Sequence, residues 1–122
     1  MSKHLVIVAL LALTACGTPA VDDLCSPENS LRCGDTTEAL VCERGRLRAV
    51  PCRGPDGCVE SGESAVCDVT RARADDDCPR AYELRGQCDA SNTNRALICR
   101  SGKWTAEACT ACAIQNGNVV CR

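Results

Sequence analysis

The chain has 122 residues, a net charge of −2 at pH 7 and 13 cysteines, but it contains no phenylalanine, one tryptophan (Trp104) and one tyrosine (Tyr82). So few bulky apolar side chains cannot fill a large hydrophobic core, whereas this density of cysteine is typical of small domains held together by disulfides. The charge balance lacks the basic excess of nucleic-acid-binding domains, so we expect no nucleic-acid partner.

The first residues form a short apolar segment. Lys3 precedes an apolar run over residues 5–13. A helix that spans a bilayer needs about 20 apolar residues, so this run is too short to span and is typical of a signal peptide. The run ends in Leu13-Thr14-Ala15-Cys16, which is an aliphatic residue followed by two small residues and a cysteine.

This ending resembles the lipobox of bacterial lipoproteins. The resemblance implies that residues 1–15 are a signal peptide and that Cys16 is lipidated and becomes the N-terminus of a protein anchored at the cell envelope. Gly17 and Thr18 follow, where enterobacterial lipoproteins kept at the inner membrane usually carry aspartate, so the outer membrane is favoured. The odd number of cysteines also needs an explanation, and lipidation of one of them supplies it. The alternative is an ordinary signal peptide with a chance cysteine at position 16.

The remaining 12 cysteines fall into two sets of six. The third and fourth cysteines enclose nine residues in both sets, and the fifth and sixth enclose eight. Other residues repeat as well, since Ala39-Leu40-Val41-Cys42 matches Ala96-Leu97-Ile98-Cys99. The sequence therefore predicts a duplicated module. The two sets are Cys25, Cys33, Cys42, Cys52, Cys58 and Cys67, and then Cys78, Cys88, Cys99, Cys109, Cys112 and Cys121.

Two further segments lack cysteine. Residues 16–24 are expected to be a lipidated tether, and residues 68–77 are charged and have no apolar period, so they are expected to be a linker. The first module then covers residues 25–67 and the second module residues 78–122. Within the linker, Asp75-Asp76-Asp77 is expected to be a solvated stretch, with a weak cation site as the alternative.

Turn signals between β-prone runs predict hairpins in each module. Arg44-Gly45 separates residues 39–42 from 47–52, and Ser101-Gly102 separates residues 96–99 from 104–109. At the end of the second module, Asn116-Gly117 favours a type I′ turn, and Gly62-Glu63 in the first module favours a type II′ turn. The predicted fold class is a small, disulfide-rich, mostly β protein with two tandem modules of short antiparallel strands and hairpins.

The hairpin register suggests which cysteines pair. Counting outward from the two turns, Cys58 faces Cys67 and Cys112 faces Cys121, so these pairs are predicted disulfides. The four other cysteines of each module allow three pairings. The weakly favoured one is first with third and second with fourth. It gives Cys25–Cys42 with Cys33–Cys52, and Cys78–Cys99 with Cys88–Cys109.

The residue types present limit the possible chemistry. The only histidine, His4, lies in the expected signal peptide, so the remaining chain has no imidazole for nucleophilic catalysis or metal binding. Cys109-Thr110-Ala111-Cys112 is a CxxC, which could mean zinc or redox exchange, but the first module breaks the motif. We therefore expect structural disulfides, no metal or other cofactor, and no enzymatic activity.

A binding face is predicted on the second module. This module carries six Arg and Lys against three acidic residues, whereas the first carries five against seven. Arg95, Arg100 and Lys103 lie near one predicted hairpin together with Trp104. In the functional interpretation Trp104 is an exposed platform for a sugar or a partner protein. In the structural one it packs over a disulfide, with its N–H on a polar partner.

The sequence thus predicts a non-catalytic lipoprotein with a binding or structural role at the envelope surface. Its expected partners are the membrane, through the lipid anchor, and an envelope glycan or protein. A protease inhibitor or toxin-like effector is the first alternative, in which Arg53 in the loop of residues 53–57 enters a protease cleft. An enzyme is the least favoured alternative.

Overall fold

Ten short strands and one turn of 3₁₀-helix make up the computed structural model, which describes residues 17–122. The expected signal peptide and Cys16 lie outside the described residues. The strands of the first module are β1 (Leu31–Cys33), β2 (Glu38–Glu43), β3 (Arg46–Pro51), β4 (Cys58–Ser61) and β5 (Ser64–Cys67). The second module contains η1 (Arg80–Tyr82), β6 (Gly86–Cys88), β7 (Arg95–Arg100), β8 (Lys103–Ala108), β9 (Cys112–Gln115) and β10 (Asn118–Cys121).

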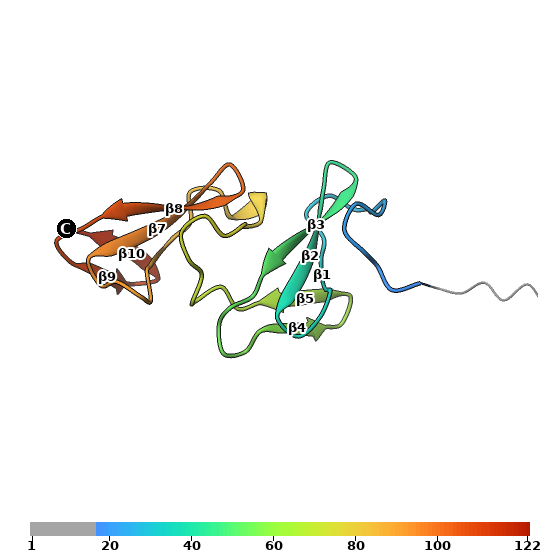
Figure 1. Ribbon diagram of the computed structural model, residues 1–122, viewed down its shortest axis with the longest axis horizontal. Coiled ribbons are helices and arrows are strands. Elements are labelled where there is room, and N and C mark those ends of the chain that lie inside the picture. Colours follow the sequence, from blue (N-terminus) through green and yellow to red (C-terminus); the bar gives the residue numbers. More distant parts are fainter. Residues whose placement is uncertain (1–16) are drawn as a thin grey trace, which may run out of the picture.

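Each module is a three-stranded antiparallel sheet with a separate hairpin (Figure 1). The sheets have the orders β1-β2-β3 and β6-β7-β8, and the hairpins are β4–β5 and β9–β10. In Figure 1 the two modules lie one after the other along the longest axis of the molecule, joined by the yellow-green segment between them. The predicted fold class is confirmed.

Turn chemistry accounts for the strand register. Arg44-Gly45, Ser101-Gly102 and Asn116-Gly117 all have positive φ at both central residues, as a type I′ turn requires. At Gly62-Glu63 only the glycine has a positive φ, as in the predicted type II′ turn. The resulting register places Cys58 opposite Cys67 and Cys112 opposite Cys121, as the sequence predicts.

The disulfides nevertheless follow a different pattern from the predicted one. Cys25–Cys42 and Cys78–Cys99 are confirmed. The predicted Cys58–Cys67, Cys112–Cys121, Cys33–Cys52 and Cys88–Cys109 are wrong. The observed pairs are Cys33–Cys58, Cys52–Cys67, Cys88–Cys112 and Cys109–Cys121, with Cα–Cα distances of 5.6, 5.1, 5.6 and 5.3 Å.

The physical reason is the packing of each hairpin against its sheet. Cys58 and Cys67 are both buried and belong to the same cluster as Val41 and Val50 of the sheet. Their sulfur atoms bond to Cys33 at the end of β1 and to Cys52 directly after β3 instead of to each other. An isolated two-stranded hairpin is marginal in water, and two covalent bonds to the larger sheet stabilise it.

The apolar clusters are small and centred on cysteine. In the first module, Ala39, Val41 and Val50 pack around two disulfides. In the second, Leu97 and Trp104 pack against Cys78 and Cys99. Val69, in the segment between the modules, packs against both clusters. Disulfides thus take the place of the large aromatic side chains that the sequence lacks.

The two segments expected to be tether and linker each pair with a strand of the sheet that follows them. The N-terminal segment (residues 17–24) pairs with β3, where the Asp22 amide donates to Leu47 O and the Leu47 amide donates to Asp23 O, at 2.8 and 2.9 Å. The connecting segment (residues 68–77) pairs with β8 in the equivalent manner, between Asp75, Asp76 and Trp104, at 2.8 and 2.9 Å.

The repeat therefore begins earlier than the first cysteine of each module. Asp22-Asp23-Leu24-Cys25 matches Asp75-Asp76-Asp77-Cys78, and both first aspartates have a positive φ near 70°. Each of these segments adds an edge to the adjacent three-stranded sheet through an isolated bridge, Leu24 with Arg46 and Asp77 with Lys103. Neither is a free linker.

Candidate functional site

The predicted binding face of the second module lacks the exposed tryptophan that the functional interpretation placed on it. Trp104 lies opposite Cys99 in the register, as predicted, but it is only 2% exposed. A buried indole cannot serve as a platform for a ligand, so the structural interpretation of Trp104 is correct in its packing against the Cys78–Cys99 disulfide. The expected polar partner is missing, since Trp104 Nε1 has no hydrogen-bond acceptor among residues 17–122.

Each of the three predicted cationic side chains is paired with an acid. Arg95 donates to the buried carboxylate of Asp89 from Nε at 2.8 Å and also from Nη2. Arg100 Nη2 lies 2.6 Å from Glu107 Oε1.

Lys103 Nζ lies 2.9 Å from Asp77 Oδ1. Arg100 and Lys103 face each other across the hairpin, as predicted, but their neighbouring acids offset the repulsion. The surplus positive charge of this hairpin is therefore neutralised within the molecule, partly by the connecting segment.

The cysteines of the CxxC and the side chain of Arg53 also make structural contacts. Cys109 and Cys112 belong to different disulfides. Arg53 makes a two-point ion pair with Asp76, from Nε at 2.7 Å and from Nη2 at 3.0 Å. Arg53 thus holds the first module against the connecting segment instead of projecting as an inhibitor residue would. Among residues 17–122, no three His, Cys, Asp or Glu side chains are arranged to hold a metal ion.

Arg48 joins the two modules. Its Nε and Nη2 donate to the two carboxylate oxygens of Glu43 at 2.7 and 3.0 Å, and Nη2 also donates to Cys78 O at 2.7 Å. Glu43 in turn accepts from the Arg80 amide at 2.8 Å. Burial alone would raise the pKa of the Glu43 carboxyl, but the hydrogen bonds and charges of Arg48 and Arg80 hold this pKa below its ordinary value of 4.5.

Asp76 belongs to the same contact between the modules. It accepts from Arg53 and, through Oδ2, from the Arg73 amide at 3.0 Å. Burial opposes its ionisation, and the hydrogen bonds from Arg53 and Arg73 outweigh that effect and lower the pKa of Asp76. Asp76 is therefore partly buried and ion-paired. The expected solvated stretch is wrong for this residue, whose side chain is 12% exposed.

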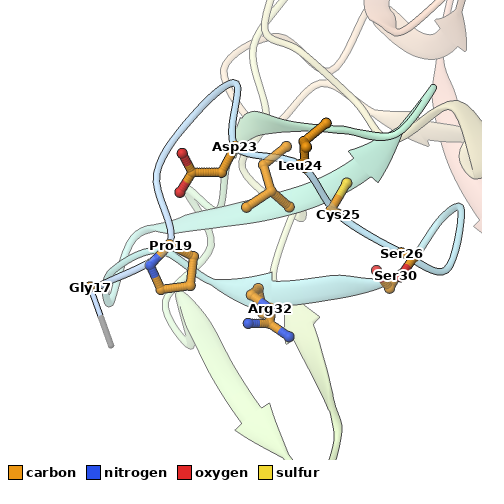
Figure 2. A pocket seen from close by; sticks show the side chains of 9 residues that line it. Gly17, Pro19, Asp23, Leu24, Cys25, Ser26, Ser30 and Arg32 are labelled. Carbon is orange, nitrogen blue, oxygen red and sulfur yellow. The ribbon is translucent and has the colours of Figure 1, made fainter. Parts of the chain in front are cut away.

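An open hollow of about 510 Å³ lies beside the N-terminal segment. Figure 2 shows Asp23, Leu24 and Cys25 following one another along this segment, with Arg32 on the neighbouring β1. We call it the N-terminal hollow. Its lining consists of Gly17, Pro19, Asp23, Leu24, Cys25, Ser26, Ser30, Arg32 and Leu47.

The chemistry of the N-terminal hollow suits binding. It offers one guanidinium, on Arg32, and one carboxylate, on Asp23, whose Oδ2 accepts from the Ala20 amide at 2.8 Å. No imidazole or free thiol lies among the lining residues, since Cys25 is bonded to Cys42. Leu24 on its wall is 80% exposed, the highest exposure among the large apolar side chains described.

The N-terminal hollow was not predicted from the sequence. The signal that could have found it is the repeated Asp-Asp-x-Cys, which marks residues 22–25 as the start of a folded repeat and not as a tether. The predicted binding residues of the second module come together on one hairpin, but they form internal ion pairs and a buried cluster.

Comparison with family models, with curated proteins and with solved structures finds no match for this chain. In the part of the chain that the structure describes, no helix is long and apolar enough to cross a membrane.

Proposed function

We propose that this protein is a lipid-anchored component of the cell envelope, attached through Cys16, with a non-catalytic binding or structural role. The observation that carries the proposal is the sequence Leu13-Thr14-Ala15-Cys16 directly before a disulfide-rich body. One acyl chain gives only marginal membrane binding, whereas the two or more chains of a bacterial lipoprotein anchor stably. The outer membrane is the favoured location because Gly17, not aspartate, follows Cys16.

The structure supports a non-catalytic role through the way its charged side chains are used. Glu43, Asp76 and Asp89 all accept hydrogen bonds from arginines, which fixes them as structural anions. A glycan or protein partner at the envelope remains the proposed ligand class for the exposed surface.

The test replaces Cys16 with Ser in the full chain, expressed in a bacterium that processes lipoproteins. Metabolic labelling with a radioactive fatty acid should label the native protein and a Thr18→Ala control, because the control keeps all four lipobox residues. The Cys16→Ser protein should take up no label and should leave the membrane fraction. Label retained by Cys16→Ser would refute the anchor.

A further inference from the structure

The exposed apolar residues beside the N-terminal hollow are not required by the fold. Leu24 is 80% exposed and Val21 is 50% exposed. In the second module the position of Leu24 is occupied by Asp77, with the same bridge to the following hairpin. Asp77 pairs there with Lys103, so a polar residue satisfies this position. A large apolar side chain in water at position 24 therefore suggests a role in contact with another surface.

The N-terminal segment holds this surface close to Cys16. The Cys25 amide donates to Gly45 O at 3.0 Å, the Asp22 amide donates to Leu47 O, and the Ala20 amide donates to Asp23. Only residues 17–19 lie between Cys16 and the first of these hydrogen bonds. At 3.3–3.6 Å per residue, Cys16 can lie at most about 14 Å from Ala20 along the chain. A lipid on Cys16 therefore keeps Ala20 within a distance of about two headgroup layers, each about 5–8 Å thick, from the lipid-bearing residue.

A second copy of the chain cannot repeat at this surface the contact that joins the two modules. In the second module, the residues equivalent to Leu24 and Cys25 are Asp77 and Cys78, and Arg48 of the first module lies against them at 3.4 and 2.7 Å. In a head-to-tail dimer, the second module of the neighbouring copy would meet this surface. That module has Thr105 at the position of Arg48 and Arg100 at the position of Glu43. The pair that joins the modules is thus absent from the end of the second module.

We propose that the first module rests on the membrane through Leu24 on the wall of the N-terminal hollow, with this apolar side chain inserted at the bilayer interface. This inference rests on the proposed lipidation of Cys16. Asp22 and Asp23 lie beside the apolar residues, and charged groups are costly in the hydrocarbon core, so the insertion is shallow. It is driven by apolar contact and not by anionic lipids, so it is insensitive to salt.

The experiment uses the full lipidated protein reconstituted in phosphatidylcholine vesicles that contain a brominated phosphatidylcholine. Leu24→Trp places a fluorophore on the proposed contact. Ile114→Trp is the matched control, because Ile114 is also exposed, at 54%, but lies in the second module on β9. Trp104 contributes a constant background because it is buried.

The emission of Leu24→Trp should shift to shorter wavelength in vesicles and should be quenched by the brominated lipid at low and high salt. Ile114→Trp should show neither effect. Unquenched Leu24→Trp, or equal quenching at both positions, would overturn the proposed contact. Mass spectrometry of the same samples separates the two proposals, because absence of the lipid from Cys16 refutes the anchor, whereas lipid without quenching refutes only the resting face.

Amide exchange of the native protein gives a second measurement that needs no substitution. The exposed amides of residues 18–24 should exchange more slowly in vesicles than in protein from which the acyl chains have been removed. Equal exchange in both states would contradict the contact even if Leu24→Trp altered the local structure.

Discussion

Gly57 is held where no other residue fits. Its φ is +59°, and an added Cβ would collide with the carbonyl oxygen of Thr36, which also accepts the Cys58 amide at 2.9 Å. Gly57→Ala should lower the free energy of unfolding by about 3 kcal/mol through left-handed strain and overpacking. Gly45→Ala is the control, since Gly45 also has a positive φ but no atom within 4 Å of the added Cβ.

Gly45→Ala should cost only about 1 kcal/mol. Guanidinium unfolding of the oxidised proteins, followed by circular dichroism, measures both values. Equal costs for the two substitutions would show that the approach of Thr36 is unimportant.

Among the buried acids, Glu43 is the one that accepts hydrogen bonds from both modules, from the Arg48 side chain and from the Arg80 amide. Glu43→Gln removes the charge that Arg48 and Arg80 share and should lower the free energy of unfolding by about 2 kcal/mol at pH 7. Glu107→Gln is the control, since the Arg100–Glu107 pair is exposed on both sides and should change stability by under about 1 kcal/mol.

The same carboxyl makes stability depend on pH. Because folding lowers the pKa of Glu43, its contribution is fully present above the ordinary value of 4.5 and is lost as the pH falls through the lowered pKa. Chemical unfolding at a series of pH values between neutral and acid should show this loss in the native protein. The loss should be smaller in Glu43→Gln, while Asp68, Asp76 and Asp89, whose pKa values are also lowered, supply the remainder. An unchanged acid dependence in Glu43→Gln would contradict the assignment.

At the scale of elements, each hairpin depends on its bonds to the neighbouring sheet. Replacing Cys109 and Cys121 together with Ala should open β9–β10 locally and cost about 2–4 kcal/mol, with Cys88–Cys112 as the remaining bond. Amide exchange should rise over residues 110–122 while β7 and β8 stay protected.

The comparison variant replaces Cys78 and Cys99, both fully buried in the cluster with Trp104. It should raise exchange throughout the second module. Uniform loss of protection in both variants would show that the C-terminal hairpin is not an independent element.

Local sequence signals predicted the hairpins well but not what the hairpins pack against. Asn116-Gly117 and the alternating residues around it determine the register of β9 and β10, because turn type and strand alternation are local properties. The partner of Cys112 depends on which sheet lies under the hairpin, and this is set by residues far apart in the sequence. β1 and β6 were missed because a strand of three residues carries too little alternation to detect.

The ion pairs of the predicted binding residues were not foreseen for a similar reason. Arg95, Arg100 and Lys103 form a basic group in the sequence, but the acids that neutralise them are six, seven and 26 residues away. Lys103 pairs with Asp77 of the connecting segment, which composition alone predicted to be a linker. Counting charges per module therefore overstated the free positive charge of the second module.

At the scale of the whole molecule, polar contacts centred on Arg48 and Arg53 connect the modules. Replacing both arginines with Met keeps the apolar stems but removes the ion pairs to Glu43 and Asp76. Nuclear magnetic relaxation should then give different tumbling times for the two modules, and a single tumbling time is expected for the native protein. Arg44→Met is the control, because Arg44 is exposed and forms no salt bridge within residues 17–122. A single tumbling time in the double variant would show that Val69 and the backbone suffice to join the modules.

The disulfide pattern also decides where cutting the backbone would matter. Every peptide bond within residues 25–67 and within residues 78–121 lies inside a loop closed by a disulfide. A protease that nicks either module once therefore leaves its fragments covalently joined. The N-terminal segment and the connecting segment lack this protection, and the connecting segment presents Arg71 and Arg73 on the surface. Trypsin-like cleavage there would leave the second module attached to the first only through non-covalent contacts, those of Arg48, Arg53 and Val69.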